Sequence, residues 1–153
     1  MDELDSRPII GKRNRDADLG YAILRLTLGL DFLFHSASRW PHVGQFLDKT
    51  VGQFGGTPLP SWSVRWYSIG ILICEPLVGL LLFIGFRTRG ALVAGGLLVA
   101  TLVFGTALRG DFTVLAEQLI YALLFFLLMR HRQENDRWSV DRIVARQSRA
   151  AKA

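Results

Sequence analysis

Five ionisable residues of this 153-residue sequence stand inside long apolar runs: Arg25, Asp31, His35, Glu75 and Glu117. At membrane depth a charged side chain costs roughly 3 kcal/mol on insertion scales, so such residues usually face the interior of a helix bundle or a hydrated cavity. Carboxylates beside a histidine can hold and transfer protons, because their surroundings tune how readily they ionise. The residue types therefore indicate a buried polar site suited to moving protons.

The spacing in the first apolar run places its polar residues together. Asp31, His35 and Arg39 follow one another at intervals of four, and Arg25 falls near the same side of a helix. At ~100° per residue these four side chains share an arc of about 120°. One face of this helix is therefore polar throughout.

We predict a polar pocket in the outer half of the protein, formed by Asp31, His35, Glu117, Gln118 and Tyr121. The residues predicted to be catalytic are His35, Glu75 and Glu117, as proton donors and acceptors for a quinone or a thiol. The residues predicted to contact the quinone or to line the pocket are Arg25, Asp31, Arg39 and Tyr121. The alternative is that these groups satisfy one another and only fix the helices.

A specific pairing is predicted in mid-membrane. Measured from the outer ends of their runs, Arg25 and Glu75 differ in depth by roughly 6 Å, which a guanidinium can reach. Pro76 lacks an amide hydrogen, so the carbonyl of Leu72 loses its helical partner. We expect Arg25 to bridge Glu75 and this carbonyl, as an ion pair that either serves the site or fixes the helix register.

Other redox chemistries lack their ligands. Cys74 is the only cysteine, which excludes an internal disulfide or dithiol, and His42 and His131 lie outside the apolar runs. A zinc site requires clustered cysteine and histidine, and a di-iron site requires Glu-x-x-His repeats. We therefore expect no intrinsic cofactor and no metal, with quinone as the candidate ligand.

Four apolar runs must position these residues. The runs hold only four of the 31 charged residues, and they are Leu19–Ser38, Trp66–Phe86, Ala91–Leu108 and Val114–Met129. A membrane core of ~30 Å needs about 20 helical residues. Ala91–Leu108 carries no charge on any face, unlike the helices of a soluble bundle. The sequence predicts an all-α, integral membrane four-helix bundle.

The basic residues predict an orientation. Of the 18 Lys and Arg residues, 13 fall in the N-terminal tail, the Arg87–Gly90 turn and the C-terminal tail, whereas four fall in the opposite segments. This bias places both termini in the cytoplasm. It accounts for the pI of about 10.0 without nucleic-acid binding.

Three regions are predicted. Residues 1–18 form a flexible cytoplasmic tail, residues 19–129 the transmembrane domain, and residues 130–153 a basic amphipathic cytoplasmic tail that suits anionic lipid. The long loop between the first two runs contains the repeated sequence Val-Gly-Gln-Phe at 43–46 and 51–54. Its apolar spacing predicts an amphipathic helix lying in the outer membrane interface.

Three segments of the sequence resemble the DoxX/DoxD family. The first is Leu24–His35, with its Arg25, Gly29 and His35; the second runs from Glu75-Pro76 to Gly85-Phe86-Arg87-Thr88-Arg89. The third comprises the run that opens at Glu117 and the tail Arg137-Trp138-Ser139-Val140-Asp141. The order and spacing of these motifs extend the resemblance over about residues 19–142.

The resemblance implies a four-helix membrane protein that acts as an oxidoreductase subunit. The best-known relatives form the membrane part of thiosulfate:quinone oxidoreductase and work with a partner subunit; others are linked to sulfur and thiol redox balance, and distant eukaryotic relatives are membrane chaperones.

Two functions are consistent with the sequence. One is a quinone-linked redox subunit of a bacterial-type inner membrane; the other is a non-catalytic scaffold or assembly subunit. Either would lie in the bilayer and associate with a protein partner or with further copies of itself.

Overall fold

The computed structural model describes residues 15–150, which are almost entirely helical and include no β-strand. The elements are α1 (Arg15–Ala37), the 3-10 helix η1 (Trp40–His42), α2 (Val43–Gln53), α3 (Ser61–Ile84), α4 (Thr88–Arg109), α5 (Phe112–Asn135) and α6 (Val140–Ala150). Most of the tail predicted at 1–18 lies outside the described residues, but Arg15–Asp18 form the first turn of α1.

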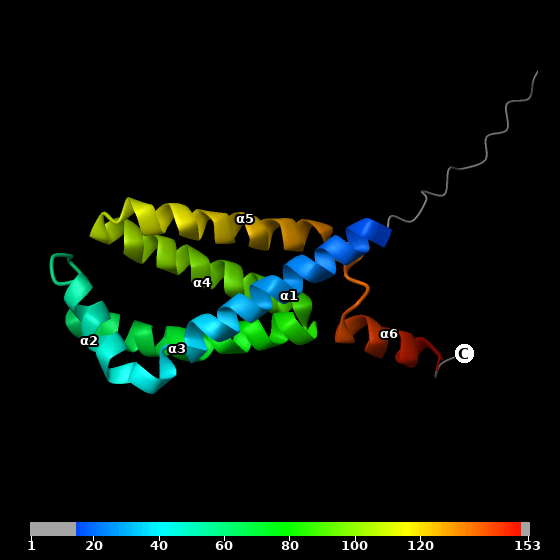
Figure 1. Ribbon diagram of the computed structural model, residues 1–153, viewed down its shortest axis with the longest axis horizontal. Coiled ribbons are helices and arrows are strands. Elements are labelled where there is room, and N and C mark those ends of the chain that lie inside the picture. Colours follow the sequence, from blue (N-terminus) through cyan, green and yellow to red (C-terminus); the bar gives the residue numbers. More distant parts are fainter. Residues whose placement is uncertain (1–14, 151–153) are drawn as a thin grey trace, which may run out of the picture.

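The four long helices form an up-and-down bundle (Figure 1). α1 packs mainly along α3, α3 contacts α4, α4 packs along α5, and α5 contacts α1. The short helix α2 lies at one end of the bundle and α6 lies at the other (Figure 1). We refer to these as the α2 end and the α6 end. The first turn of α1 and the last turn of α5 both lie at the α6 end.

Three helical segments within residues 15–150 are long and apolar enough to cross a membrane. They are α3, α4 and a segment that begins at Phe112 and contains α5. Their outward faces carry exposed apolar side chains such as Leu97, Phe104 and Phe126. Exposed apolar surface of this extent matches a hydrocarbon environment, so the chain is a multi-pass membrane protein.

The fourth predicted span, α1, does not meet the same apolar criterion because it carries several charged residues. Nevertheless, it packs along α3, and its outward face is apolar. Exposed side chains recur along that face at helical intervals at Leu19, Ile23, Leu26, Leu30 and Phe34. That stripe suits lipid contact, and α1 remains our predicted fourth span.

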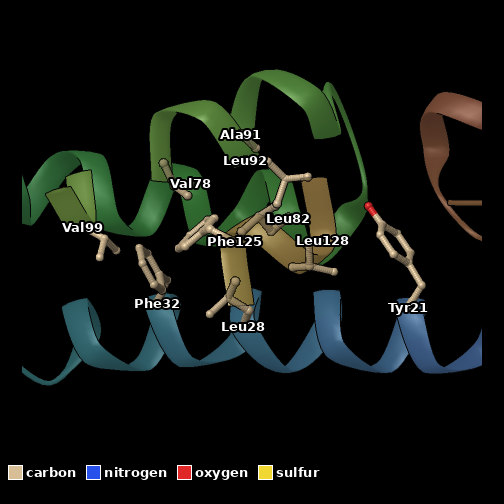
Figure 2. Packing of buried hydrophobic residues seen from close by; sticks show 10 residues of the cluster. All are labelled: Tyr21, Leu28, Phe32, Val78, Leu82, Ala91, Leu92, Val99, Phe125 and Leu128. Carbon is tan, nitrogen blue, oxygen red and sulfur yellow. The ribbon is translucent and has the colours of Figure 1, made fainter. Parts of the chain in front are cut away.

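The core of the bundle is formed by apolar side chains from all four long helices (Figure 2). Phe32 of α1 lies edge-on to Phe125 of α5, with ring centroids 5.5 Å apart. Phe125 in turn occupies the space beside Gly95, where a Cβ atom would approach its ring to 2.3 Å. Gly95 therefore serves packing between α4 and α5.

The backbones of α1 and α3 touch through two glycines. A Cβ atom on Gly29 would lie 2.7 Å from the amide nitrogen of Phe83, and one on Gly79 would lie 2.8 Å from the carbonyl oxygen of Gly29. Backbone atoms cannot give way as side chains do, so both positions require glycine for this approach. This contact sets the distance between the two helices.

We expect Gly29→Ala to force α1 and α3 apart and to destabilise the bundle by about 1–3 kcal/mol, as overpacking does. The measurement is the midpoint of thermal unfolding of the purified chain in detergent. Gly20→Ala, on the same helix with no atom within 4 Å of its Cβ position, is the control and should leave the midpoint unchanged or slightly higher. Equal midpoints for both variants would contradict the close contact.

Candidate functional site

A cavity of about 220 Å³ lies among the four long helices, toward the α2 end. We call it the chamber. Its lining residues are Asp31, Phe32, His35, Arg39, Glu75, Val99, Leu102, Val114, Glu117, Gln118 and Tyr121. The chamber brings together six of the seven residues predicted for the site, and the exception is Arg25.

The innermost ion pair of the chamber joins α3 to the segment after α1. Arg39 donates a hydrogen bond from Nη1 to Glu75 Oε2 at 2.7 Å, and the Glu75 side chain is 7% exposed. A charge-assisted bond of this length holds both side chains in place. The Arg39 guanidinium also lies over the ring of Phe46 in α2, 5.0 Å from its centroid.

A second polar pair joins α1 to α5. The Tyr121 hydroxyl donates to Asp31 Oδ2 at 2.9 Å. The Tyr121 ring meets Phe32 edge-on, with centroids 6.1 Å apart. The hydrogen bond gives Asp31 a defined partner, and the ring contact supplies an apolar wall beside it.

The other two acid–base groups of the chamber are accessible. His35 and Glu117 are exposed, whereas Asp31 is partly and Glu75 fully buried. His35 and Glu117 therefore form the open edge of the chamber. Cys74 is exposed on α3 and does not line the chamber.

A groove of about 360 Å³ adjoins the chamber between α1 and α5. We call it the α1/α5 groove. It shares Asp31, Glu117 and Tyr121 with the chamber, and its other lining residues are Leu24, Thr27, Leu28, Ile120 and Leu124. The Asp31–Tyr121 pair therefore stands at the border between a mainly apolar groove and a polar interior.

The predicted bridge from Arg25 to Glu75 and the Leu72 carbonyl is wrong. Glu75 pairs with Arg39, and the Leu72 carbonyl accepts from the Ser36 hydroxyl at 3.2 Å. Pro76 does free that carbonyl, but a hydroxyl of the neighbouring helix satisfies it.

Arg25 instead caps the C-terminus of α3. Its guanidinium donates to the carbonyl of Leu82, to that of Phe83 at 3.2 Å and to that of Trp138 at 3.0 Å. Its Nε lies 3.9 Å from Asp136, and the residue is 2% exposed. The last carbonyls of a helix lack internal partners and carry partial negative charge, which a buried cation compensates.

The predicted bridge failed because it assumed a different register of α3 against α1. Ser36 lies opposite Leu72 and Gly29 opposite Gly79, so Arg25 faces the final turn of α3. Glu75 is seven residues before Leu82, about 10 Å along the helix axis. The early turns of α3 extend past the end of α1 and pack against α2, so the two helices have no common outer end from which depth could be measured.

A sequence comparison assigns this bundle to a family. The sequence model of the DoxX family matches residues 20–109, more than half of the chain. The chain belongs to the DoxX family. The matched segment contains α1 residues of the chamber together with Arg39 and Glu75, whereas Glu117 and Tyr121 lie beyond it. No curated protein and no solved structure matches the chain.

Metal binding has no candidate ligand set in the part of the DoxX chain that the structure describes. No group of three or more His, Cys, Asp or Glu residues is placed there to hold an ion. The chamber's own side chains can form hydrogen bonds, compensate charge and transfer protons.

A double-mutant cycle tests the pairing in the chamber. We expect Arg39→Gln and Glu75→Gln to be coupled by about 0.5–3 kcal/mol in unfolding free energy, because each removal leaves the other charge without its partner. Arg65, at the same end, pairs with Asp48 instead. The matched pair Arg65→Gln and Glu75→Gln should therefore be additive. Additive effects for Arg39 with Glu75 would exclude the pair as a stabilising contact.

Proposed function

We propose that this DoxX chain is the quinone-binding membrane subunit of an oxidoreductase whose redox centre lies on a partner subunit. The observation that carries the proposal is the junction, at Asp31 and Tyr121, of a chamber that also holds His35, Arg39 and Glu75 with a groove whose further lining is mainly aliphatic. A quinone has the same division, with a polar headgroup on an isoprenoid tail.

The dimensions support this assignment. Pockets for drug-sized molecules usually enclose ~300–1,000 Å³. The chamber, at about 220 Å³, is large enough for a single ring but not for a tailed molecule. The groove, at about 360 Å³, would hold the first part of the tail between α1 and α5.

The chamber's groups suit a quinone headgroup. Quinone carbonyl oxygens accept hydrogen bonds, and two residues of the chamber lining, Arg39 and Tyr121, carry donors. Phe32 offers an apolar surface for the ring. The headgroup would replace Asp31 as the acceptor of the Tyr121 hydroxyl.

The proposed reaction is reduction of quinone to quinol, which takes up two electrons and two protons. A partner's redox centre supplies the electrons from a reduced sulfur compound, the donor class that the family resemblance implies. His35 and Glu117, at the open edge, deliver the protons. Arg39, held in place by Glu75, donates to the quinone oxygen that does not accept from Tyr121. In the orientation predicted from the basic residues, the chamber lies in the outer half of the inner membrane and both termini are cytoplasmic.

A second candidate function is a scaffold that holds a partner complex. The observation that favours it is α6, where Ile143 and Val144 are 54% and 50% exposed beyond the end of the bundle (Figure 1). Co-purification of a stoichiometric partner without quinone would select this function over the first.

Arg39→Gln and Tyr121→Phe are each expected to weaken quinone binding about fivefold, since each removes roughly 1 kcal/mol of hydrogen bonding to a quinone oxygen. The measurement is quinone retained per chain after purification in mild detergent, quantified by mass spectrometry. Arg65→Gln removes an arginine that pairs with Asp48 at the same end and lines neither the chamber nor the groove, and it should retain quinone as the unaltered chain does. Full retention by both chamber variants would remove the chamber from the site.

Leu124→Trp tests the groove separately, because the larger ring fills it. We expect retention of long-tailed quinone to fall about tenfold, while a tailless benzoquinone still protects the chain against thermal unfolding. Leu123→Trp places the same ring on the adjacent exposed position, which does not line the groove, and serves as the control. Equal losses in the two variants would show a general disturbance of α5 rather than a tail site.

A further inference from the structure

A third cavity, of about 170 Å³, lies under α2. Its walls come from α2, the first turns of α3, the last turns of α4, and Gln118 of α5. It shares Arg39, Leu102 and Gln118 with the chamber. We call it the α2 cavity, and it adjoins the chamber through these shared residues.

The two cavities differ in charge. The chamber is lined by the three carboxylates of Asp31, Glu75 and Glu117. The α2 cavity is lined by two arginines, Arg39 and Arg109, and by no carboxylate. The nearby carboxylate of Asp111 stands outside the lining, 3.8 Å from Arg109 Nη2. The α2 cavity is therefore lined by guanidinium donors, and carboxylates outside the lining compensate their charge: Glu75 pairs with Arg39 and Asp111 with Arg109.

The repeated sequence in α2 holds both arginines in place. Phe46 ends the first copy, and the Arg39 guanidinium lies 5.0 Å from its ring centroid. Phe54 follows as the end of the second copy, and Arg109 lies 5.2 Å from that ring. Gln53 also accepts from Arg109 Nη1 at 2.7 Å. Stacking on an aromatic face restrains a guanidinium while leaving its N–H edge available.

Two polar atoms at this cavity are buried without a hydrogen-bond partner in the described residues: Arg109 Nε and Gln118 Oε1. The Gln118 amide contacts Thr106 through Nε2 at 3.0 Å. Amide orientation follows from the hydrogen-bond network, and the Thr106 hydroxyl can also donate. If the Gln118 amide is reversed, its oxygen accepts from the Thr106 hydroxyl and its N–H₂ group takes the position without a partner. Gln118 and the Nε of Arg109 then both carry a donor that lacks an acceptor.

We propose that the α2 cavity binds a small oxygen-bearing anion through Arg109, Gln118 and Arg39. A buried donor without an acceptor costs about 1–3 kcal/mol, and one anion would satisfy donors from three parts of the chain. The volume limits the ligand to a few atoms. The site goes beyond the proposed function, because anion binding here requires no quinone and no electron transfer.

The test is a sulfate titration of the full chain in non-ionic detergent, with chloride exchanged to keep ionic strength constant. A bound anion raises the thermal midpoint in a saturable manner, whereas the general salting effect of sulfate does not saturate. We expect saturation, at least a tenfold weaker affinity in Arg109→Gln and a several-fold weaker affinity in Gln118→Leu. Arg65→Gln, which removes an arginine at the same end, should bind sulfate unchanged.

Two further arms make the result decisive. Phosphatidylglycerol is titrated separately, in place of sulfate. Saturation by sulfate but not by the lipid identifies a soluble anion, and saturation by the lipid but not by sulfate identifies a lipid phosphate; in either case the effect should depend on Arg109. If Arg109→Gln fails to fold, Arg109→Lys and Gln118→Leu give the same comparison. Unsaturable stabilisation by both anions, or equal affinity in Arg109→Gln and the unaltered chain, would overturn the proposal. Quinone retention by Arg109→Gln is measured in parallel, so failure of the anion site is distinct from failure of the quinone site.

Discussion

The bundle depends on one buried cation, Arg25, which caps the last turn of α3 and holds the chain after α5 through the Trp138 carbonyl. Removing the partners of a buried charge costs several kcal/mol, so this contact fixes where α1 lies against α3. The register then brings Gly29 against Gly79 and Ser36 to the free carbonyl of Leu72. A shift of one helical turn would break all three contacts at once, and it would also separate Arg39 from Glu75.

At the α6 end, the backbone amides at the start of α4 also find hydrogen-bond partners. Asp141, in the first turn of α6, accepts from the backbone amides of Arg87 and Thr88 at 2.7 and 2.8 Å. Arg25 at a helix C-terminus and Asp141 at a helix N-terminus each carry the charge that the helix dipole favours. With helix ends held at the α6 end, the polar groups at the α2 end need not all stabilise the bundle. Because the α6 end holds the helices together, the polar side chains of the chamber can serve a function other than stability.

The sequence predicts the helical class, the family and the residues that gather around the chamber, because the length of apolar runs and the helical period are local properties. His35 and Asp31 share a face whatever the neighbouring helices do. The partners of Arg25 and Glu75, in contrast, cannot be predicted from local sequence. The partners of Arg25 are backbone carbonyls up to 113 positions away, which no side-chain pattern marks. The depth of Glu75 depends on how far α3 runs past α1 beneath α2, which is a tertiary property. Asp31 belongs to no motif, and its hydrogen-bond partner, Tyr121, is known only from the structure.

Arg39 explains why the chamber and the α2 cavity adjoin without merging. A guanidinium is planar and presents five N–H groups in a fixed fork, so it can bind different acceptors along its edges while one face packs on a ring. In this chain one nitrogen binds Glu75 and one face lies over Phe46, and the residue lines both cavities. A lysine could supply the charge but not two directed edges and a stacking face. The geometry at this border therefore requires arginine. Its side chain stands between a cavity lined by carboxylates and one lined by guanidinium and amide groups.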